Sequence, residues 1–172
     1  RINWGLVFAL LWLYRSAYSY VGQVLVSRLT TLGDSSQFQL GYAARGETYS
    51  IESVAFGSMR TLATVLTEIV GVWAFRLGGG NPVLINICFQ TIGFLGIVVF
   101  LRALPSNIRL VSLIVLMLPS FTLWSSVASK ESIVVLAVGL VGAYIVKEYT
   151  GQPKSILMLI LALVTILIFK NQ

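Results

Sequence analysis

Long apolar runs alternate with short polar separators along most of this chain. A transmembrane helix needs ~20 consecutive, mostly apolar residues, and six segments approach that length. These segments are residues 4–26, 61–75, 83–101, 110–124, 133–146 and 156–169. The shorter ones gain length from flanking Lys, Arg, Ser and Trp, which extend a span through the membrane interface. The pattern predicts an all-α fold, an integral membrane helical bundle of five or six transmembrane helices without a β-sheet.

The separators between these segments indicate how the chain is organised. Those at 77–82, 102–109 and 150–154 are short and contain Pro, which marks turns, and such short connections make consecutive helices antiparallel neighbours. One separator, the polar loop 27–58, is long and holds three of the six acidic residues; loops of this length in compact domains are mostly functional. We expect residues 1–172 to form a single transmembrane helical domain, and the abrupt start and stop of the chain suggest part of a longer protein.

The composition of the chain is typical of an integral membrane protein and not of a soluble protein. Hydrophobic residues make up 57% of the sequence, charged residues only 10%, and the mean hydropathy is +0.89, whereas soluble domains carry about 25% charged residues. The net charge of +6 comes from Lys and Arg that stand mostly at the ends of apolar segments, where they reach lipid headgroups. Membrane lipid is therefore the expected partner of these charges, and nucleic acid is not.

Two further features of the composition narrow the chemistry. The sequence contains no histidine and a single cysteine, Cys88. This excludes His-ligated haem, His-containing zinc sites and Ser-His-Asp catalysis within the chain. The sequence shows no cluster of metal-ligand residues, so we expect neither a bound metal nor a cofactor. Cys88 lies in an apolar run and is interpreted as a small hydrophobic residue.

The distribution of basic residues gives an expected orientation in the membrane. If all six segments cross in turn, one side carries Arg1, Arg76, Lys130 and Lys170. The other side then carries Arg28, Arg45, Arg60, Arg102, Arg109, Lys147 and Lys154. Because the cytoplasmic side of a membrane protein carries the excess of Lys and Arg, this count places the N-terminus outside.

Two charged residues lie inside apolar segments, where a charge is costly. Glu68 is in the middle of 61–75, and a carboxylate at membrane depth costs ~2.5 kcal/mol or more unless it is paired, protonated or hydrated. It is a candidate acid, base or ion ligand that faces a cavity, or alternatively a structural partner of Arg15 or Arg60. Arg15 stands among tyrosines and is either a cation for a phosphate-bearing lipid or substrate, or an anchor at headgroup depth.

The stretch 118–132 is the least typical of a membrane helix. Pro119 breaks or kinks a helix at membrane depth, and four serines, a threonine and a tryptophan then lead to the adjacent pair Lys130 and Glu131. One interpretation is a bent helix pair that lines a polar cavity, in which Lys130 holds a phosphate and Glu131 orients it. The other is an ordinary corner, in which Ser129 caps the next helix and Glu131 complements the helix dipole.

Three features in this order resemble a known class of membrane enzyme: Gly33-Asp34 in the loop after the first helix, Glu68 in the second, and the segment 118–131 before the fifth. The order is similar to that of the N-terminal half of bacterial polytopic enzymes of surface-polysaccharide assembly. These include exopolysaccharide and O-antigen polymerases and GT-C glycosyltransferases. The resemblance covers residues 33–148 and implies a protein of the bacterial inner membrane.

The same resemblance implies roles for two residues. Asp34 would be the acidic residue of an extracytoplasmic loop, and Lys130 would be the cation that meets a lipid-pyrophosphate donor. From its neighbours alone, Asp34 also suits an ordinary solvated turn. The chain departs from the pattern in two ways: the charge count above does not place the Asp34 loop outside, and the chain is too short for the dozen or so helices of such enzymes.

Two functional hypotheses follow. In the first, the chain is a membrane glycosyltransferase or polysaccharide polymerase that acts on lipid-linked sugars. Asp34 or Glu68 would be the base for an acceptor hydroxyl, and Arg15 or Lys130 would stabilise the departing pyrophosphate. In the second, the chain is a non-catalytic integral membrane subunit of a larger complex, its charges form structural pairs, and the polar loop is a docking surface. Lipid-linked sugar is the expected partner in the first case, and other membrane subunits in the second.

Overall fold

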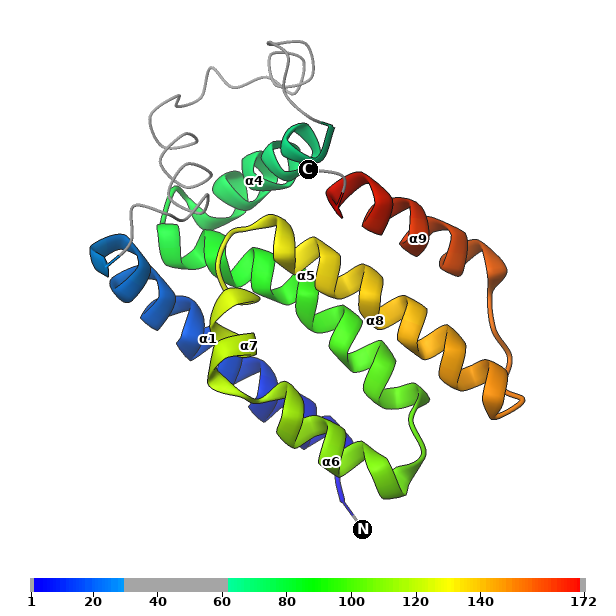
Figure 1. Ribbon diagram of the computed structural model, residues 1–172. Helices are drawn as coiled ribbons and strands as arrows, with labels where there is room; N and C mark the ends of the chain where they lie inside the picture. The colour runs from blue at the N-terminus through cyan, green and yellow to red at the C-terminus, as the bar shows by residue number, and fades with distance from the viewer. Residues whose placement is uncertain (1, 30–61, 171–172) are drawn as a thin grey trace.

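The computed structural model describes residues 2–29 and 62–170, and all regular secondary structure in these two ranges is helical (Figure 1). The all-α prediction is thus confirmed for this part of the chain. The helices are α1 (Trp4–Leu29), α4 (Leu62–Gly78), α5 (Pro82–Ala103), α6 (Ser106–Leu116), α7 (Pro119–Trp124), α8 (Lys130–Tyr149) and α9 (Ile156–Lys170). Asp34 and most of the polar loop 27–58 lie outside the described residues.

Five of the six predicted apolar segments coincide with one helix each, and the fourth does not. Residues 110–124 were expected as one segment, but α6 ends at Leu116 and α7 begins at Pro119. Proline has no amide N–H and is favoured in the first turn of a helix, whereas it breaks a helix interior. The break expected at Pro119 is therefore confirmed, and a single helix over 110–124 is wrong.

The turn before α5 shows how local sequence sets the helix ends. Gly79 and Gly80 have φ values of 58° and 77°, a left-handed conformation that glycine adopts without the steric cost of a Cβ atom. Asn81 then caps α5, because its side-chain oxygen accepts hydrogen bonds from the backbone N–H groups of Val83 (2.9 Å) and Leu84 (3.4 Å). Such a cap satisfies donors that the first turn of a helix leaves without partners.

Helices α1 and α5 are antiparallel neighbours. The Trp12 indole N–H donates to Thr91 Oγ1 (3.1 Å), and the Asn86 amide donates to the carbonyl oxygen of Ser19 (3.3 Å), so rising numbers on α1 meet falling numbers on α5. The N-terminal end of α1 therefore lies beside the C-terminal end of α5. Arg102 at that end stacks over the ring of Phe8, 5.5 Å from its centroid.

This arrangement corrects the charge count made from the sequence. If six segments crossed in turn, the first and third would be parallel, but α1 and α5 are antiparallel. Arg109 lies over the ring of Trp4, 4.9 Å from its centroid, so Arg102 and Arg109 share one end of the bundle with the start of α1. The count had placed them on the side opposite to the N-terminus, and that assignment is wrong.

Helices α5 and α8 lie side by side and run in the same direction (Figure 1). Gly93 of α5 lies against the backbone of Ser132, and Gly96 lies against Gly139 further along α8. The two backbones approach so closely that a Cβ atom on Gly139 would lie 2.3 Å from the carbonyl oxygen of Gly96. Small residues permit such close approach of helices. Helices α6 and α7 follow α5 in the chain and return it to the end of the bundle where α8 begins.

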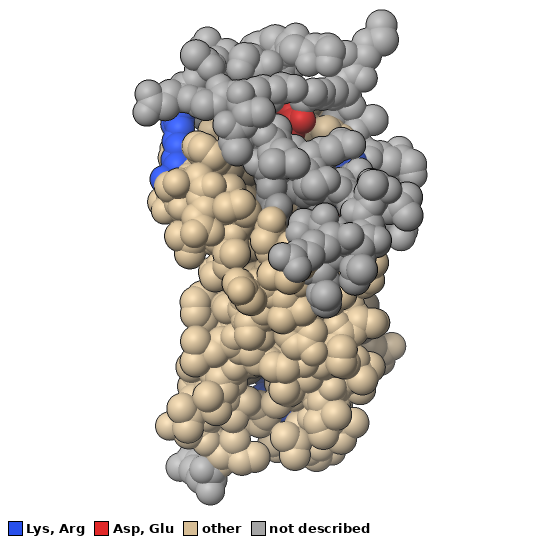
Figure 2. Space-filling view, turned by 90° about the vertical axis from the view of Figure 1, so that its left-hand side faces the viewer, with Lys and Arg blue, Asp and Glu red and all other residues tan. Residues whose placement is uncertain are grey.

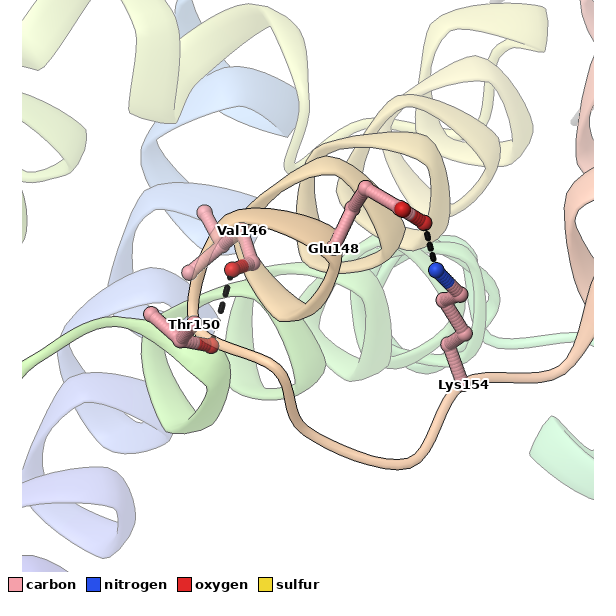
Figure 3. A network of polar contacts seen from close by, with 4 residues as sticks. All are labelled: Val146, Glu148, Thr150 and Lys154. Atoms are coloured by element: carbon pink, nitrogen blue, oxygen red, sulfur yellow. Dashed lines mark hydrogen bonds and ion pairs between the residues drawn. The ribbon is translucent and has the colours of Figure 1, made fainter.

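Helices α4 and α9 complete the described fold. Figure 1 shows α4 lying obliquely across the end of the bundle where α8 begins, and its residue Ala74 packs in one buried cluster with Ile85 and Phe89 of α5. After the turn that follows α8, α9 returns along α8. In that turn Glu148 and Lys154 form an ion pair, and the Thr150 hydroxyl donates to the carbonyl oxygen of Val146 (2.9 Å; Figure 3).

Among the helices of residues 2–29 and 62–170, two, α5 and α8, are long and apolar enough to cross a membrane. Helices α6 and α9 are apolar but shorter. Core helices of soluble proteins pass the same test of length and composition, so the feature that distinguishes α8 is its low burial: only 22% of its most apolar window is buried, against 44% for α5.

Candidate functional site

The unusual feature of the fold is a group of buried serines between α7 and α8. We call Ser125, Ser126, Ser129 and Ser132 the serine corner, and all four are at most 6% exposed. The corner begins where α7 ends and continues into the first turn of α8. A buried hydroxyl in apolar surroundings is costly unless it is hydrogen-bonded, so the partners of these serines indicate what the corner is built for.

Arg15 of α1 enters this corner and is completely buried, with an exposed fraction of 0%. One terminal nitrogen, Nη2, donates to the Ser125 hydroxyl (2.7 Å) and to the Ser125 carbonyl oxygen (3.2 Å). The guanidinium also lies over the ring of Phe121, 5.7 Å from its centroid. Arg15 thus sits inside the bundle, away from the surface position that an anchor at headgroup depth would occupy.

The other donor nitrogens of Arg15 determine what the site can bind. Its Nε and Nη1 atoms are buried and have no hydrogen-bond acceptor within 2–29 and 62–170. A buried cation normally has an anionic partner, because removing a charge from water costs several kcal/mol. A planar guanidinium with free N–H groups matches the paired oxygens of a phosphate or carboxylate. The arrangement can therefore bind an anion.

Two hydroxyls hold the serine corner in place. The Ser19 hydroxyl of α1 donates to the carbonyl oxygen of Ser126 (2.8 Å). The Ser132 hydroxyl of α8 reaches back to the carbonyl oxygens of Ser125 (3.3 Å) and Val127 (3.2 Å). These bonds satisfy backbone carbonyls that the irregular segment between α7 and α8 leaves without helical partners, and they fix the position of the Ser125 oxygens that contact Arg15.

Two amide side chains of α5 make hydrogen bonds to α1, and one of them also bonds the segment between α7 and α8. The sequence analysis did not identify either residue. Asn86 accepts a hydrogen bond from the Ala128 N–H (2.8 Å) and donates to the carbonyl oxygen of Ser19 (3.3 Å). Gln90 donates to the carbonyl oxygen of Trp12 and to the Ser16 hydroxyl, both at 3.2 Å. Asn and Gln four residues apart inside an apolar segment were the signal that would have found them.

The predicted residues Lys130 and Glu131 form the start of α8. Lys130 is half-buried and Glu131 is exposed in the first turn, where a negative charge complements the helix dipole. Ser129 occupies the N-cap position, but its side chain makes no cap hydrogen bond. For the ordinary-corner alternative, the position of Ser129 at the N-cap is thus confirmed, whereas the hydrogen bond of a side-chain cap is not formed. A substrate-binding role for Lys130 and Glu131 stays a prediction.

Glu68, the other predicted charged residue inside an apolar segment, is buried in α4 with 8% of its surface exposed. The proposed structural pairing with Arg15 does not form, because the guanidinium of Arg15 contacts Ser125 instead. The structure thus brings Arg15 together with the serine corner that precedes Lys130. It leaves Glu68 on a different helix, and Asp34 is outside the described residues.

An apolar groove opens next to this polar site. It has a volume of about 310 Å³ and lies between α5, α6, α7 and α8. Its lining includes Ile97, Leu116, Phe121 and Val138. Phe121 is shared, because the same ring that lines the groove lies beneath the guanidinium of Arg15. A polar site and an apolar groove are thus separated by one aromatic side chain.

Comparison of the chain with known protein families, with characterised proteins and with solved structures found no match. The features of the chain that bear on its function are therefore the geometry of the serine corner, Arg15 and the apolar groove.

Proposed function

We propose that this chain is an integral membrane protein whose bundle crosses the bilayer five times. The crossings would be α1, α5, the broken pair α6 and α7, α8, and α9, with α4 at one end. The parallel course of α5 and α8 supports this, because two parallel crossings need a return between them, and α6 and α7 supply it. Figure 2 supports it as well, since one face shows a long surface with almost no charged side chain.

Basic residues lie at both ends of this bundle. Arg102, Arg109, Lys147 and Lys154 lie at or near helix ends on the side where α1 begins. Arg28, Arg76, Lys130 and Lys170 lie at or near helix ends on the opposite side. Because the two counts are equal, the positive-inside rule assigns neither side to the cytoplasm. The resemblance to polysaccharide-assembly enzymes, in which the acidic loop is extracytoplasmic, implies that the C-terminal end of α1 and the start of α8 are on the outer side.

Within this frame, the proposed function is that of a membrane glycosyltransferase or polysaccharide polymerase acting on lipid-linked sugars, in the bacterial inner membrane. The observation that carries the proposal is Arg15, a completely buried cation with two donor nitrogens that have no acceptor within the described ranges. A lipid-linked sugar presents a phosphate group that such donors bind. Lys130 at the start of α8 would be a second cation for the same pyrophosphate, and Glu131 would orient it.

The chemistry requires a base and a stabilised leaving group. An acceptor hydroxyl would lose its proton to a carboxylate, Asp34 or Glu68, while its oxygen forms a bond to the anomeric carbon of the donor sugar. The bond from that carbon to the pyrophosphate oxygen breaks at the same time, and the negative charge that develops on the leaving oxygen is stabilised by the guanidinium of Arg15. Fixed donors in a site that excludes water stabilise such a charge far better than water does.

The test uses the intact protein reconstituted in vesicles with a polyisoprenyl-pyrophosphate-linked sugar, and measures glycosyl transfer to an acceptor saccharide. Arg15→Met should lower the rate about 100-fold or more, the usual effect of removing one donor to a developing charge. Arg15→Lys should retain part of the activity, because it keeps the charge and loses the planar fork. Arg102→Met, a change at an exposed arginine, is the matched control and should stay within about twofold of wild type. Equal rates for Arg15→Met and wild type would overturn the proposal.

The second candidate function is a non-catalytic integral membrane subunit of a larger complex. The observation that favours it is the exposed apolar face of α9, where Leu157, Leu161 and Leu167 are each more than half exposed. Such a face suits a partner helix as well as lipid. Purification in mild detergent separates the two functions. A protein that is monodisperse, without partner chains and active in transfer supports the enzyme, whereas inactive protein in a stable assembly with other subunits supports the subunit.

A further inference from the structure

Arg15 can bind an anion only if a path to its guanidinium opens, because the side chain is completely buried, with 0% exposed. Three contacts close it on the side of α7. The hydroxyl and the carbonyl oxygen of Ser125 accept hydrogen bonds from Nη2, and the ring centroid of Phe121 lies 5.7 Å from the guanidinium carbon. A buried hydrogen bond to a charged group is costly to break. Of these three contacts, the one with Phe121 involves no hydrogen bond and therefore opens most readily.

The backbone of α7 is held on both sides, which disfavours opening by a shift of the whole helix. Before α7, the Tyr14 hydroxyl donates to the carbonyl oxygen of Met117 (2.9 Å). After α7, the Ser19 hydroxyl donates to the carbonyl oxygen of Ser126 (2.8 Å). Phe121 lies between these two points in the chain. A rotation of its side chain between staggered rotamers leaves both hydrogen bonds in place.

The apolar groove gives the ring of Phe121 a place to move to. Protein interiors are normally packed too closely for an aromatic ring to change its position, but Phe121 lines a groove of about 310 Å³. Gly139 and Gly142 line the same groove and contribute no side chain to its wall. The other lining residues are apolar, so a ring that moves into the groove stays among apolar neighbours.

We infer that Phe121 is a movable cover of the anion site: its ring lies over Arg15 in the closed state and turns into the apolar groove in the open state. This rests on the proposed anion-binding role of Arg15 and deepens it, because it assigns the control of access to one side chain. The groove is the space that receives the cover. The closed ring shields the guanidinium, and the open ring admits an anion to it.

The experiment measures how fast phenylglyoxal, a small reagent that condenses with guanidinium groups, modifies Arg15 in the intact protein in detergent micelles. Mass spectrometry identifies the modified residue, and the exposed Arg102 is the internal reference. No substrate is needed, so the result does not depend on glycosyl transfer. Phe121→Ala removes the cover. The matched control is Phe100→Ala, the same change at another ring that lines the groove.

Phe121→Ala should raise the modification rate of Arg15 relative to Arg102 about tenfold, the order of the contribution of a cation–π contact shielded from water. Phe100→Ala should change this ratio less than about twofold, because the cation–π contact of Arg15 is retained. Equal ratios in the two variants would overturn the inference. So would a Phe121→Ala variant in which the half-buried Arg109 gains as much reactivity as Arg15, because such a protein is loosened as a whole.

The role of the groove is tested by filling it. Val138 lines the groove and is 54% exposed, so Val138→Trp fills the groove from its open side. Ile145→Trp is the control, on the same helix and 48% exposed but outside the groove lining. Val138→Trp should slow the modification of Arg15 about threefold or more, because a filled groove lowers the population of the open state. Ile145→Trp should have no effect. An unchanged rate in Val138→Trp would show that the ring does not use the groove, and the inference would fail.

The outcome is separable from that of the proposed function. If Phe121→Ala uncovers Arg15 as expected but Arg15→Met transfers sugar at the wild-type rate, the cover stands and the transferase proposal fails. If Arg15→Met abolishes transfer but Phe121→Ala leaves the reactivity of Arg15 unchanged, the anion site stands and the cover is wrong.

Discussion

The two sides of α5 pack in different ways: one side makes close backbone contacts through glycines, and the other makes hydrogen bonds through amide side chains. Toward α8, Gly93 and Gly96 let the two backbones come into contact. We call this contact between α5 and α8 the glycine interface, and close packing is what holds it together. Toward α1 and the serine corner, Asn86 and Gln90 make hydrogen bonds to backbone and side chains. The glycine interface is closely packed. On the polar side, by contrast, two buried donors of Arg15 have no acceptor within the described residues. Close backbone packing and buried donors without acceptors are thus found on opposite sides of α5.

The largest expected loss of stability comes from a substitution that disrupts the glycine interface. In Gly139→Ala the new Cβ would lie 2.3 Å from the Gly96 carbonyl oxygen and 2.8 Å from its Cα. Because backbone atoms cannot move without separating the helices, we expect a loss of about 3 kcal/mol in the free energy of unfolding. The measurement is thermal unfolding in detergent followed by circular dichroism. Gly5→Ala is the control: its nearest contact is the side chain of Asn3, so it should leave stability unchanged or slightly increased.

The next effect concerns the amides of α5 and compares two residues on the same side. Asn86→Leu removes the acceptor of the buried Ala128 N–H (2.8 Å) and should cost about 2 kcal/mol, the penalty of leaving a buried donor without a partner. Gln90→Leu should cost less, about 1 kcal/mol, because Gln90 only donates, at 3.2 Å, and its own Oε1 accepts no hydrogen bond within the described residues. Denaturation of both variants under one set of conditions checks the order. A larger loss for Gln90→Leu would contradict this reading of the polar side.

The smallest effects come from the serine corner and sharpen the comparison. Ser129→Ala should change stability by less than about 0.5 kcal/mol, because its hydroxyl makes no hydrogen bond within 2–29 and 62–170. Ser125→Ala should cost about 1–2 kcal/mol, because its hydroxyl accepts the 2.7 Å hydrogen bond from Arg15 and a bond to a charged group is the stronger kind. If the two variants unfold at the same temperature, Ser125 does not hold the cation as described.

The positions of the helices were predictable from apolar periodicity and from punctuation by Gly and Pro. The end of α6 before Pro119 and the turn at Gly79 and Gly80 follow from the restricted backbone of proline and the freedom of glycine. Directions were not predictable in the same way. Hydrophobicity shows that α1 and α5 are apolar, but it contains no information on whether they run parallel or antiparallel, so the charge count assigned Arg102 and Arg109 to the wrong side.

The candidate site was predictable only in part, for a related reason. Arg15 among tyrosines is also the composition of a membrane interface, and the sequence alone does not distinguish a surface anchor from a buried cation. Its contact with Ser125 joins residues 110 positions apart, a distance in sequence that no local pattern covers. Asn86 and Gln90 were missed because the apolar residues around them dominate the helix pattern. The serine-rich stretch was identified correctly as unusual, since Ser, Pro and Trp interrupt an otherwise apolar run.

The central claim is that Arg15 is kept buried to bind an anion and not to stabilise the fold. Thermal unfolding of wild type and Arg15→Met, each with and without a saturating isoprenyl phosphate, tests it most directly. Without ligand, the Arg15→Met variant should be as stable as wild type or more stable, because Met fills similar volume without a desolvated charge. With ligand at about 100 times its Kd, wild type should gain about 2.7 kcal/mol and the variant should gain nothing. A variant that is strongly destabilised without ligand, or a wild type that the phosphate does not stabilise, would contradict the account.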